Sequence, residues 1–293
     1  MSVIIPFFNV GNFLEETIAS VFAQTYKHWQ LLLIDDGSSD DGTDIARRCA
    51  NENPGRVLYF DHYQHRNRGV CCSRNLGVKH ATGEYLALLD ADDVWLPHKL
   101  ERQLAILRAH PAAGLVFGVS QYWVSWTGEL AGDDSMPALG IQLDRLFRPP
   151  SLLFLLYPLG RGGAPCPSDL LLARELVERI GGFEEQFDAQ RPYQLYEDQA
   201  FLVKVYSLHR SFRRGSVGRD IGCILIRVCP AFCRMMKSMP PRDCFFVNGS
   251  RSIWPSVESR KTTFRRLSMD CGGGAWDRRN DRRCASFLKV PGT

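Results

Sequence analysis

The sequence predicts an α/β fold, in which a mostly parallel β-sheet is covered by helices on both faces. In the first half of the chain, short apolar runs of strand length alternate with amphipathic stretches of helix length. The connections between them are short, which is typical of strands joined by helical crossovers. At 293 residues the chain is long enough for one large domain or two small ones.

Four expected strands are short runs of β-branched, aromatic and leucine residues that end at polar or turn-forming residues. They are residues 2–8, 31–34, 57–60 and 85–89. Apolar residues at helical spacing predict a helix in each segment between them. The first of these helices is expected to begin at Asn12, which together with Glu15 resembles a capping box.

The second half is expected to be less regular. Residues 100–109 and 115–119 predict a helix and a strand, whereas residues 133–167 are rich in Pro and Gly. We expect this Pro- and Gly-rich segment to be a long loop, which in compact domains is commonly a lid or a binding segment. Residues 170–180 and 196–206 predict two more helices.

From about Ser207 neither the helical nor the strand pattern of apolar residues persists. A strand is still expected within residues 221–228. Residues 208–293 carry 18 basic and 6 acidic side chains, whereas residues 1–207 carry 18 basic and 26 acidic ones. One hypothesis is that this basic tail, rich in Arg and Cys, is a frameshifted or disordered C-terminus. The alternative is a genuine basic segment that binds anionic lipid or an acidic polymer.

No apolar run approaches the ~20 residues that a membrane-spanning helix needs. The N-terminus also lacks the charged and apolar regions of a signal sequence. We therefore expect a cytoplasmic protein, with the inner face of the membrane as the alternative location. No nucleic-acid partner is expected.

Three carboxylates, those of Asp90, Asp92 and Asp93, follow the expected strand at residues 85–89. In open α/β sheets, ligands bind outside the carboxyl ends of the strands. Acids this close together repel one another unless a cation neutralises them. Magnesium commonly takes one or two carboxylates together with substrate phosphates, so a metal site is one interpretation. The alternative is a polar loop in which Asp93 caps the next helix.

Two further acidic pairs stand at the ends of expected elements. Asp35 and Asp36 end the second strand, and Glu197 and Asp198 open a late helix. A nucleoside diphosphate-sugar needs acceptors for its base or ribose, and its transfer needs a carboxylate that takes a proton from a hydroxyl. Taken singly, each pair has a plainer interpretation, as a turn or as compensation of a helix dipole.

Five segments in this order resemble the motifs of the family 2 glycosyltransferases: SVIIPFFN, LLLIDDGSSDDG, SRNLGVKHATGEYLALLDADD, GGFEE and YEDQAF. The resemblance covers residues 1 to about 206 and implies a GT-A type, Rossmann-like domain. Residues 1–120 would be its nucleotide-sugar-binding half and residues 121–206 its acceptor-side half. Residues 207–293 do not match the family.

The resemblance implies an inverting transfer of a sugar from a nucleotide diphosphate-sugar, most commonly a UDP-sugar, to a hydroxyl. The acceptor would be a glycan, a lipid-linked sugar or a protein, in polysaccharide or glycoconjugate synthesis. A divalent metal, Mn²⁺ or Mg²⁺, would assist. Asp90 and Asp92 would form the Asp-x-Asp motif, with Asp92 the more direct metal ligand, and Asp198 would be the general base.

The same resemblance assigns the donor pocket. Asp36 would contact the nucleotide base while Asp35 supports the turn, and Arg74 would approach the phosphates. Pro6 and Phe8 would line the base pocket.

Two other functions remain open at this point. One is a nucleotide-sugar-binding protein without turnover, because family-like acceptor elements are not recognisable after Tyr206. The other is a phosphatase of the haloacid dehalogenase type, whose nucleophile motif resembles the segment from Asp90 to Val94. That family places the motif on its first strand, whereas three strands are expected before Asp90.

Overall fold

The computed structural model describes residues 1–124, 134–136, 138–142, 144–189 and 196–208, and the backbone of four short strands beyond them. The chain divides into two compact units, Met1–Lys237 and Ser238–Thr293. In the second unit the described backbone is an antiparallel pair, β12 (Phe246–Val247) with β13 (Ser250–Arg251). The division at residue 206 expected from the sequence stays a prediction.

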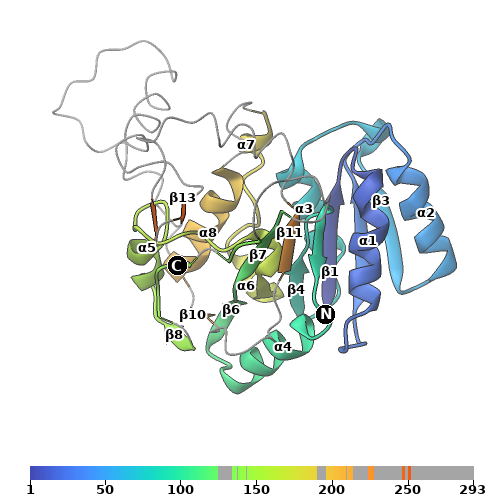
Figure 1. Ribbon diagram of the computed structural model, residues 1–293. Helices are drawn as coiled ribbons and strands as arrows, with labels where there is room; N and C mark the ends of the chain where they lie inside the picture. Colours follow the sequence, from blue (N-terminus) through green and yellow to red (C-terminus); the bar gives the residue numbers. More distant parts are fainter. Residues whose placement is uncertain are drawn as a thin grey trace, which may run out of the picture. The chain divides into compact units, whose positions relative to one another are not determined.

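An eight-stranded sheet forms the centre of the first unit, in the order β3-β2-β1-β4-β9-β6-β10-β8 (Figure 1). Its strands are β1 (Ser2–Phe7), β2 (Gln30–Asp35), β3 (Val57–Asp61), β4 (Tyr85–Leu88), β6 (Ala113–Phe117), β8 (Arg145–Phe147), β9 (Leu171–Ala173) and β10 (Arg210–Arg213). The first four are mutually parallel, and β6 is parallel to β10. Only the pairs that involve β9 or β8 are antiparallel among these described strands. The predicted fold class is therefore confirmed.

Helices cover both faces of this sheet. One apolar core contains side chains of α1 (Gly11–Phe22), α2 (Gly42–Glu52) and α4 (Lys99–Ala109). The other core contains side chains of α3 (Val70–His80), α5 (Ser151–Leu155), α6 (Arg174–Arg179) and α8 (Glu197–Leu208). Neighbouring strand residues enter opposite cores, as Val3 and Ile4 do, because side chains alternate along a strand.

Three shorter strands form a second sheet in the order β5-β11-β7. They are β5 (Asp93–Trp95), β7 (Ser120–Trp123) and β11 (Ile224–Arg227). The strand expected within residues 221–228 is thus confirmed. Short one-turn helices at Tyr63–His65 (η1) and Pro167–Asp169 (η3), and the small helix α7 (Gln186–Ala189), complete the described elements.

The expected helix over residues 170–180 was wrong at its start. Leu171–Ala173 form strand β9, which lies between β4 and β6, and the helix α6 begins only at Arg174. Leu171 and Leu172 are fully buried and enter opposite cores. A short apolar run satisfies a buried strand or a buried helix equally well, so its sequence pattern did not distinguish them.

Three local expectations were also wrong. No side-chain hydrogen bond caps α1 from Asn12; the carboxylate of Asp40 accepts the N–H of Gly11 at 2.8 Å instead. Asp93 does not cap the following helix, because it begins β5, and His98 is the N-cap residue of α4. The Pro- and Gly-rich segment contains β8 and α5, since its leucines supply apolar side chains for one core.

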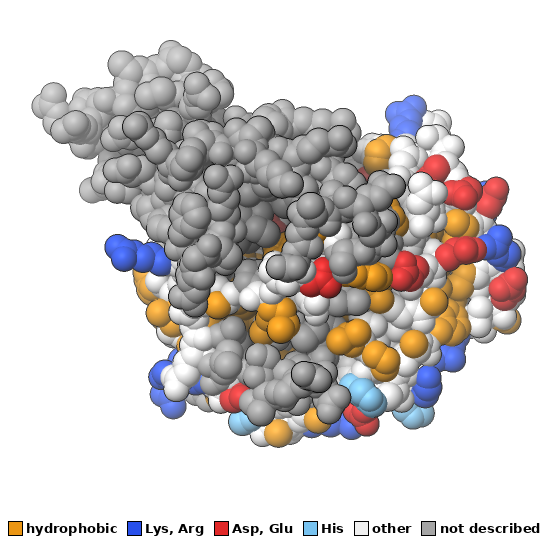
Figure 2. All heavy atoms as spheres, viewed as in Figure 1, with side chains coloured by type: hydrophobic (Ala, Val, Ile, Leu, Met, Phe, Trp, Pro, Cys, Tyr) orange, Lys and Arg blue, Asp and Glu red, His pale blue; other side chains and the backbone are white. Residues whose placement is uncertain are grey.

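Among the described residues, no helix is both long and apolar enough to span a bilayer. On the face shown in Figure 2, acidic and basic side chains of these residues are interspersed with apolar ones.

Most of the basic tail lies outside the described residues. The hypotheses of a frameshift, of disorder and of binding to anionic lipid concern that tail and stay predictions. Its strand β10 was not expected from the sequence.

Candidate functional site

The carboxylate loop, which we define as Asp90–Asp93, connects β4 to β5 at the carboxyl end of the parallel strands. Strand β4 lies beside β1, and β1 lies beside β2, so the loop is on the same sheet edge as Asp35. A turn closes the loop, because the N–H of Asp93 donates to the carbonyl of Asp90 at 3.0 Å. The expected position of the acids after the fourth strand is confirmed.

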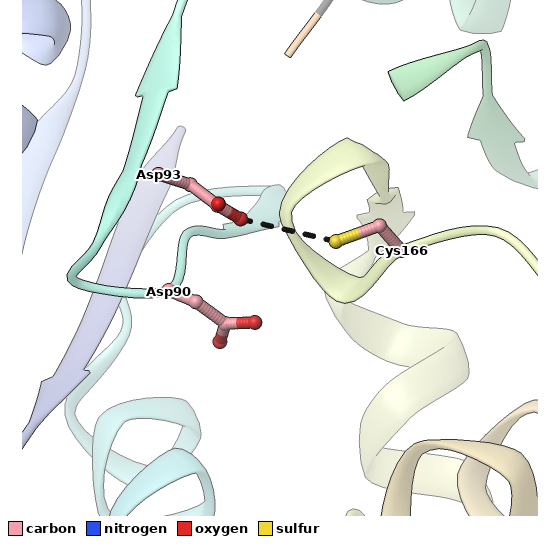
Figure 3. Close-up of side chains that lie close together, drawn as sticks. All are labelled: Asp90, Asp93 and Cys166. Atoms are coloured by element: carbon pink, nitrogen blue, oxygen red, sulfur yellow. Dashed lines mark hydrogen bonds between the residues drawn. The ribbon is translucent and has the colours of Figure 1, made fainter. Parts of the chain in front are cut away.

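Asp90, Asp93 and Cys166 form a group whose potential metal-ligand atoms all lie within 4.8 Å of one another. Figure 3 shows the three side chains converging from the carboxylate loop and from the segment before η3. The thiol of Cys166 donates to Oδ2 of Asp93 at 3.9 Å. Burial and then the charges of Asp93 and Asp90 raise the pKa of the Cys166 thiol well above its usual value. The sulfur is therefore a protonated donor to Asp93.

The donor set of the loop fits a hard divalent cation, because carboxylate oxygens are the ligands that Mg²⁺ and Mn²⁺ prefer. Asp92, the expected direct ligand, is half-buried and lies outside the group of Asp90, Asp93 and Cys166. Its role as a ligand stays a prediction. Sequence reasoning missed Cys166 entirely, since nothing in its local sequence links it to a loop more than 70 residues earlier.

Arg74 joins the carboxylate loop to the acids of α8. Its guanidinium is buried, donates to Oδ1 of Asp90 at 2.8 Å and lies 3.5 Å from Oε1 of Glu197. The ring of Phe183 lies 5.3 Å from the guanidinium carbon. Within the described part of the chain, Nε and Nη1 make no hydrogen bond. Arg74 therefore lies between two carboxylates, one in the carboxylate loop and one in α8.

Glu197 and Asp198 form the first turn of α8, and both have an unusually high proton affinity. Burial and then the charge of Asp198 raise the pKa of Glu197 to about 7, although Arg74 opposes the shift. Burial likewise raises the pKa of Asp198 to about 6, again against the effect of Arg74. The oxygens of Asp198 accept bonds from the N–H and the amide of Gln199 at 2.7 and 3.2 Å. A carboxylate with such a pKa is a better proton acceptor at neutral pH than an ordinary one.

Asp35 is fully buried at the end of β2, and its carboxylate accepts several hydrogen bonds. Its Oδ1 accepts the N–H of Ser38 at 2.8 Å, and its Oδ2 accepts the hydroxyls of Thr43 and Tyr59 at 2.5 and 3.1 Å. These contacts hold the turn after β2, and the role of Asp35 in a donor site stays a prediction.

Asp36 holds the segment that leads into α3. Its carboxylate accepts the N–H groups of Arg68 at 2.6 Å and of Gly69 at 3.0 Å, and His62 Nε2 lies 3.5 Å away. Burial raises the pKa of Asp36, while these hydrogen bonds and His62 act to lower it. Pro6 is buried in β1, and Phe8, 44% exposed, lies just beyond its end. The residues expected to line a base pocket thus lie at this edge of the sheet, and their role stays a prediction.

Two other side chains form hydrogen bonds between α3 and later segments at the site. Sequence reasoning did not identify them. The amide of Asn75 exchanges two hydrogen bonds with the backbone of Phe183, at 2.9 and 2.8 Å. The carboxylate of Asp188 accepts the N–H groups of Cys71 and Cys72 at the start of α3. Both contacts join α3 to residues more than 100 positions later, which local patterns do not reveal.

Known proteins resemble this chain in both sequence and fold. Residues 2–147 match the family model described as glycosyl transferase family 2. A protein of Bacillus subtilis that carries the name teichuronic acid biosynthesis glycosyltransferase, TuaG, is 34% identical over 121 residues, which are 41% of this chain and 46% of that protein. The aligned part of this chain spans under half the length of six curated relatives that are 34–42% identical to it.

Two solved structures share the fold. TarS of S. aureus in complex with UDP has a TM-score of 0.57 at 20% identity, covering 80% of this chain and 63% of that one. The mannosyltransferase PcManGT of Pyrobaculum calidifontis, in complex with GDP-Man and Mn²⁺, has a TM-score of 0.53 at 17% identity, covering 98% of this chain and 77% of that one. From the match over residues 2–147 and this fold, the chain belongs to glycosyl transferase family 2 and has a fold of the GT-A type.

Proposed function

We propose that the chain is an inverting glycosyltransferase that moves a sugar from a nucleotide diphosphate-sugar to an acceptor hydroxyl. The contact of Arg74 with both Asp90 and Glu197 carries this proposal. It joins a carboxylate loop suited to a metal and a diphosphate with an acid pair of raised pKa suited to receive a proton. A donor site and a proton acceptor in one connected group are what single-step sugar transfer requires.

The donor is a nucleotide diphosphate-sugar in this proposal, with a UDP-sugar favoured. The similar folds of TarS, solved with UDP, and of PcManGT, solved with GDP-Man, support the donor class. Asp36 would contact the base on the edge lined by Pro6 and Phe8. The positive charge of Arg74, which lies between Asp90 and Glu197, suits the negative charge of the diphosphate.

Asp90 and Asp92 would hold Mn²⁺ or Mg²⁺. When bound, the ion offsets negative charge on the nucleoside diphosphate. The carboxylate of Asp90 is 30% exposed, so one of its faces is open to a ligand while Arg74 holds the other. Mn²⁺ in the PcManGT complex supports a metal in this fold.

Asp198 would take the proton of the acceptor hydroxyl. Its raised pKa of about 6 leaves it ionised at neutral pH, yet more basic than an ordinary aspartate. Glu197 is then the neighbour that pairs with Arg74, and burial and the charge of Asp198 raise its own pKa to about 7.

The product would belong to polysaccharide or glycoconjugate synthesis, which the name of TuaG supports. Glycan, lipid-linked and protein acceptors all remain within the proposal. The alternative is a nucleotide-sugar-binding protein without turnover. It is favoured by one observation, that most residues after 208, where an acceptor-side segment would lie, show no helical or strand periodicity.

Calorimetric titration of UDP into the protein with and without Mn²⁺ tests the donor site. We expect binding that depends on the metal and that Asp92→Ala weakens by about 100-fold, because a direct ligand is lost. Glu52→Gln, an exposed acid on α2, is the control and should bind as the unaltered protein does. Unchanged binding in the Asp92 variant would remove Asp92 from the metal site.

A further inference from the structure

The carboxylate loop is held from two sides by buried hydroxyl groups that neither the family motifs nor the acid pairs include. Ser168 of η3 contacts it from one side and Thr17 of α1 from the other. Both residues are fully buried. Since they come from positions about 75 residues before and after the loop, they link three separate parts of the chain at the site.

Ser168 makes two hydrogen bonds to the loop with its hydroxyl. Oγ accepts the N–H of Asp90 at 2.9 Å and donates to Oδ2 of Asp93 at 2.6 Å. Its carbonyl oxygen also accepts the indole N–H of Trp95 at 2.8 Å. One small residue therefore fixes the first and last residues of the loop and the strand that follows.

Thr17 makes two contacts to the backbone of the same loop. Its Oγ1 donates to the carbonyl oxygens of Ala91 at 2.8 Å and of Asp93 at 2.9 Å. The hydroxyl has one hydrogen, which the two carbonyls share. Together with Ser168 it fixes the loop on both sides of Asp92.

We propose that Thr17 and Ser168 form a hydroxyl clamp, a pair of positioning residues that sets the geometry of the carboxylate loop for its metal. Like charges in a short loop repel one another and push the loop open. Hydroxyls oppose this opening without adding positive charge, so the negative charge of the loop stays available to a cation. Arg74 already offsets part of the charge of Asp90, and a further cationic contact would offset more of it.

Loss of either hydroxyl removes hydrogen bonds that polar groups of the loop now make. Without Oγ of Ser168, the Asp90 N–H and the Asp93 carboxylate lose a bond, and without Oγ1 of Thr17 two carbonyls do. Buried groups left in this state drive local rearrangement toward water. Groups that orient metal ligands in this way typically affect metal affinity by about 10- to 100-fold when removed.

Two buried serines provide matched controls. Ser20 lies one turn after Thr17 on α1 and donates to the carbonyl of Thr17, without a bond to the loop. Ser2 accepts the N–H of Gly83 at 2.9 Å in β1, the same kind of bond that Ser168 makes to Asp90. Ser20→Ala and Ser2→Ala therefore remove a buried hydroxyl and leave the clamp intact.

The test compares Thr17→Val, Thr17→Ser and Ser168→Ala with the two controls in the full chain. Hydrogen exchange of the peptide covering residues 89–93 is expected to be about 10-fold faster in Thr17→Val and Ser168→Ala. Mn²⁺ affinity with UDP present is expected to fall by about 10-fold or more in the same two variants. Thr17→Ser keeps the hydroxyl and should restore both quantities, and the controls should leave both unchanged.

The metal measurement rests on the proposed function, whereas the exchange measurement does not. If the unaltered protein binds no Mn²⁺ with UDP, the proposed metal site fails, and the exchange rates alone decide the clamp. Unchanged exchange in both variants would overturn the clamp. Faster exchange with full Mn²⁺ affinity would overturn the positioning role, as would an equal loss in Ser2→Ala or Ser20→Ala. If one of the two variants does not fold, the exchange rate of the other variant still tests the clamp.

Discussion

Two pairs of neighbouring acids, Asp35–Asp36 and Glu197–Asp198, differ in what surrounds them. The carboxylates of the first pair accept hydrogen bonds from backbone N–H groups and hydroxyls that anchor a turn and the approach to α3. Those of the second pair have few donors, and Oε2 of Glu197 has no hydrogen-bond partner among the described residues. The first pair thus holds backbone segments through hydrogen bonds, whereas the second pair is buried with fewer donors around it.

Burial also raises the pKa of Asp36, but the N–H groups of Arg68 and Gly69 and the nearby His62 act against that shift. With few compensating donors, burial raises the pKa of Glu197 to about 7 and that of Asp198 to about 6. Arg74 is close enough to limit the shift but does not remove it. Two dipeptides of similar chemistry therefore have different surroundings, and we expect them to have different roles.

The largest expected effect is on sugar transfer in Asp198→Asn. Loss of a positioned proton acceptor should lower kcat by about 100- to 10,000-fold. Donor binding should stay unchanged, because the amide keeps the size of the side chain and the carboxylate loop is intact. The rate of nucleoside diphosphate release and a parallel calorimetric titration measure the two quantities, with Glu52→Gln as the control. Equal loss of both would show that Asp198 holds the donor and is not a base.

The second effect is on stability, and it tests the difference between the two acid pairs. Asp35→Asn should lower the free energy of unfolding by about 2 kcal/mol, because buried donors that now bond to a carboxylate lose charge-assisted bonds. Asp198→Asn should be at least as stable as the unaltered protein, since it removes a buried charge with few donors. Denaturant unfolding at neutral pH compares the two. A larger loss in the Asp198 variant would reverse the assignment of the pairs.

The smallest effect is the pH dependence of stability from the second pair. A carboxyl whose folded pKa is raised binds its proton more tightly in the folded state. Its stabilising contribution is therefore complete below the unfolded pKa and is lost as pH rises through about 6 to 7. Unfolding measured between pH 4 and 8 should show this loss, and Asp198→Asn should reduce it. An identical pH profile in the variant would contradict the raised pKa of Asp198.

Much of the first half of the fold could be predicted because its information is local. The apolar runs that became β1 to β4, and the helical spacing of α1 to α3, depend on neighbouring residues alone. The strand β9 was missed because its short leucine run fits either kind of element, and β10 because no pattern marks it.

The candidate site divides in the same way. Asp90, Arg74 and Glu197 come from segments that the motifs single out, and the fold brings them into contact. Thr17, Ser168 and Cys166 were missed because a lone buried hydroxyl or thiol has no distinctive sequence neighbourhood. Their contacts depend on how distant segments pack. The raised pKa of Asp198 also depends on that packing, because an aspartate without it has a pKa near ~3.9.

The most direct measurement of the central claim is release of nucleoside diphosphate from a panel of UDP- and GDP-sugars, with Mn²⁺ and with a chelator. We predict release from at least one UDP-sugar, dependent on the metal, and lost in Asp198→Asn. No release from any donor, with UDP still bound, would contradict the transferase and favour a nucleotide-sugar-binding protein without turnover.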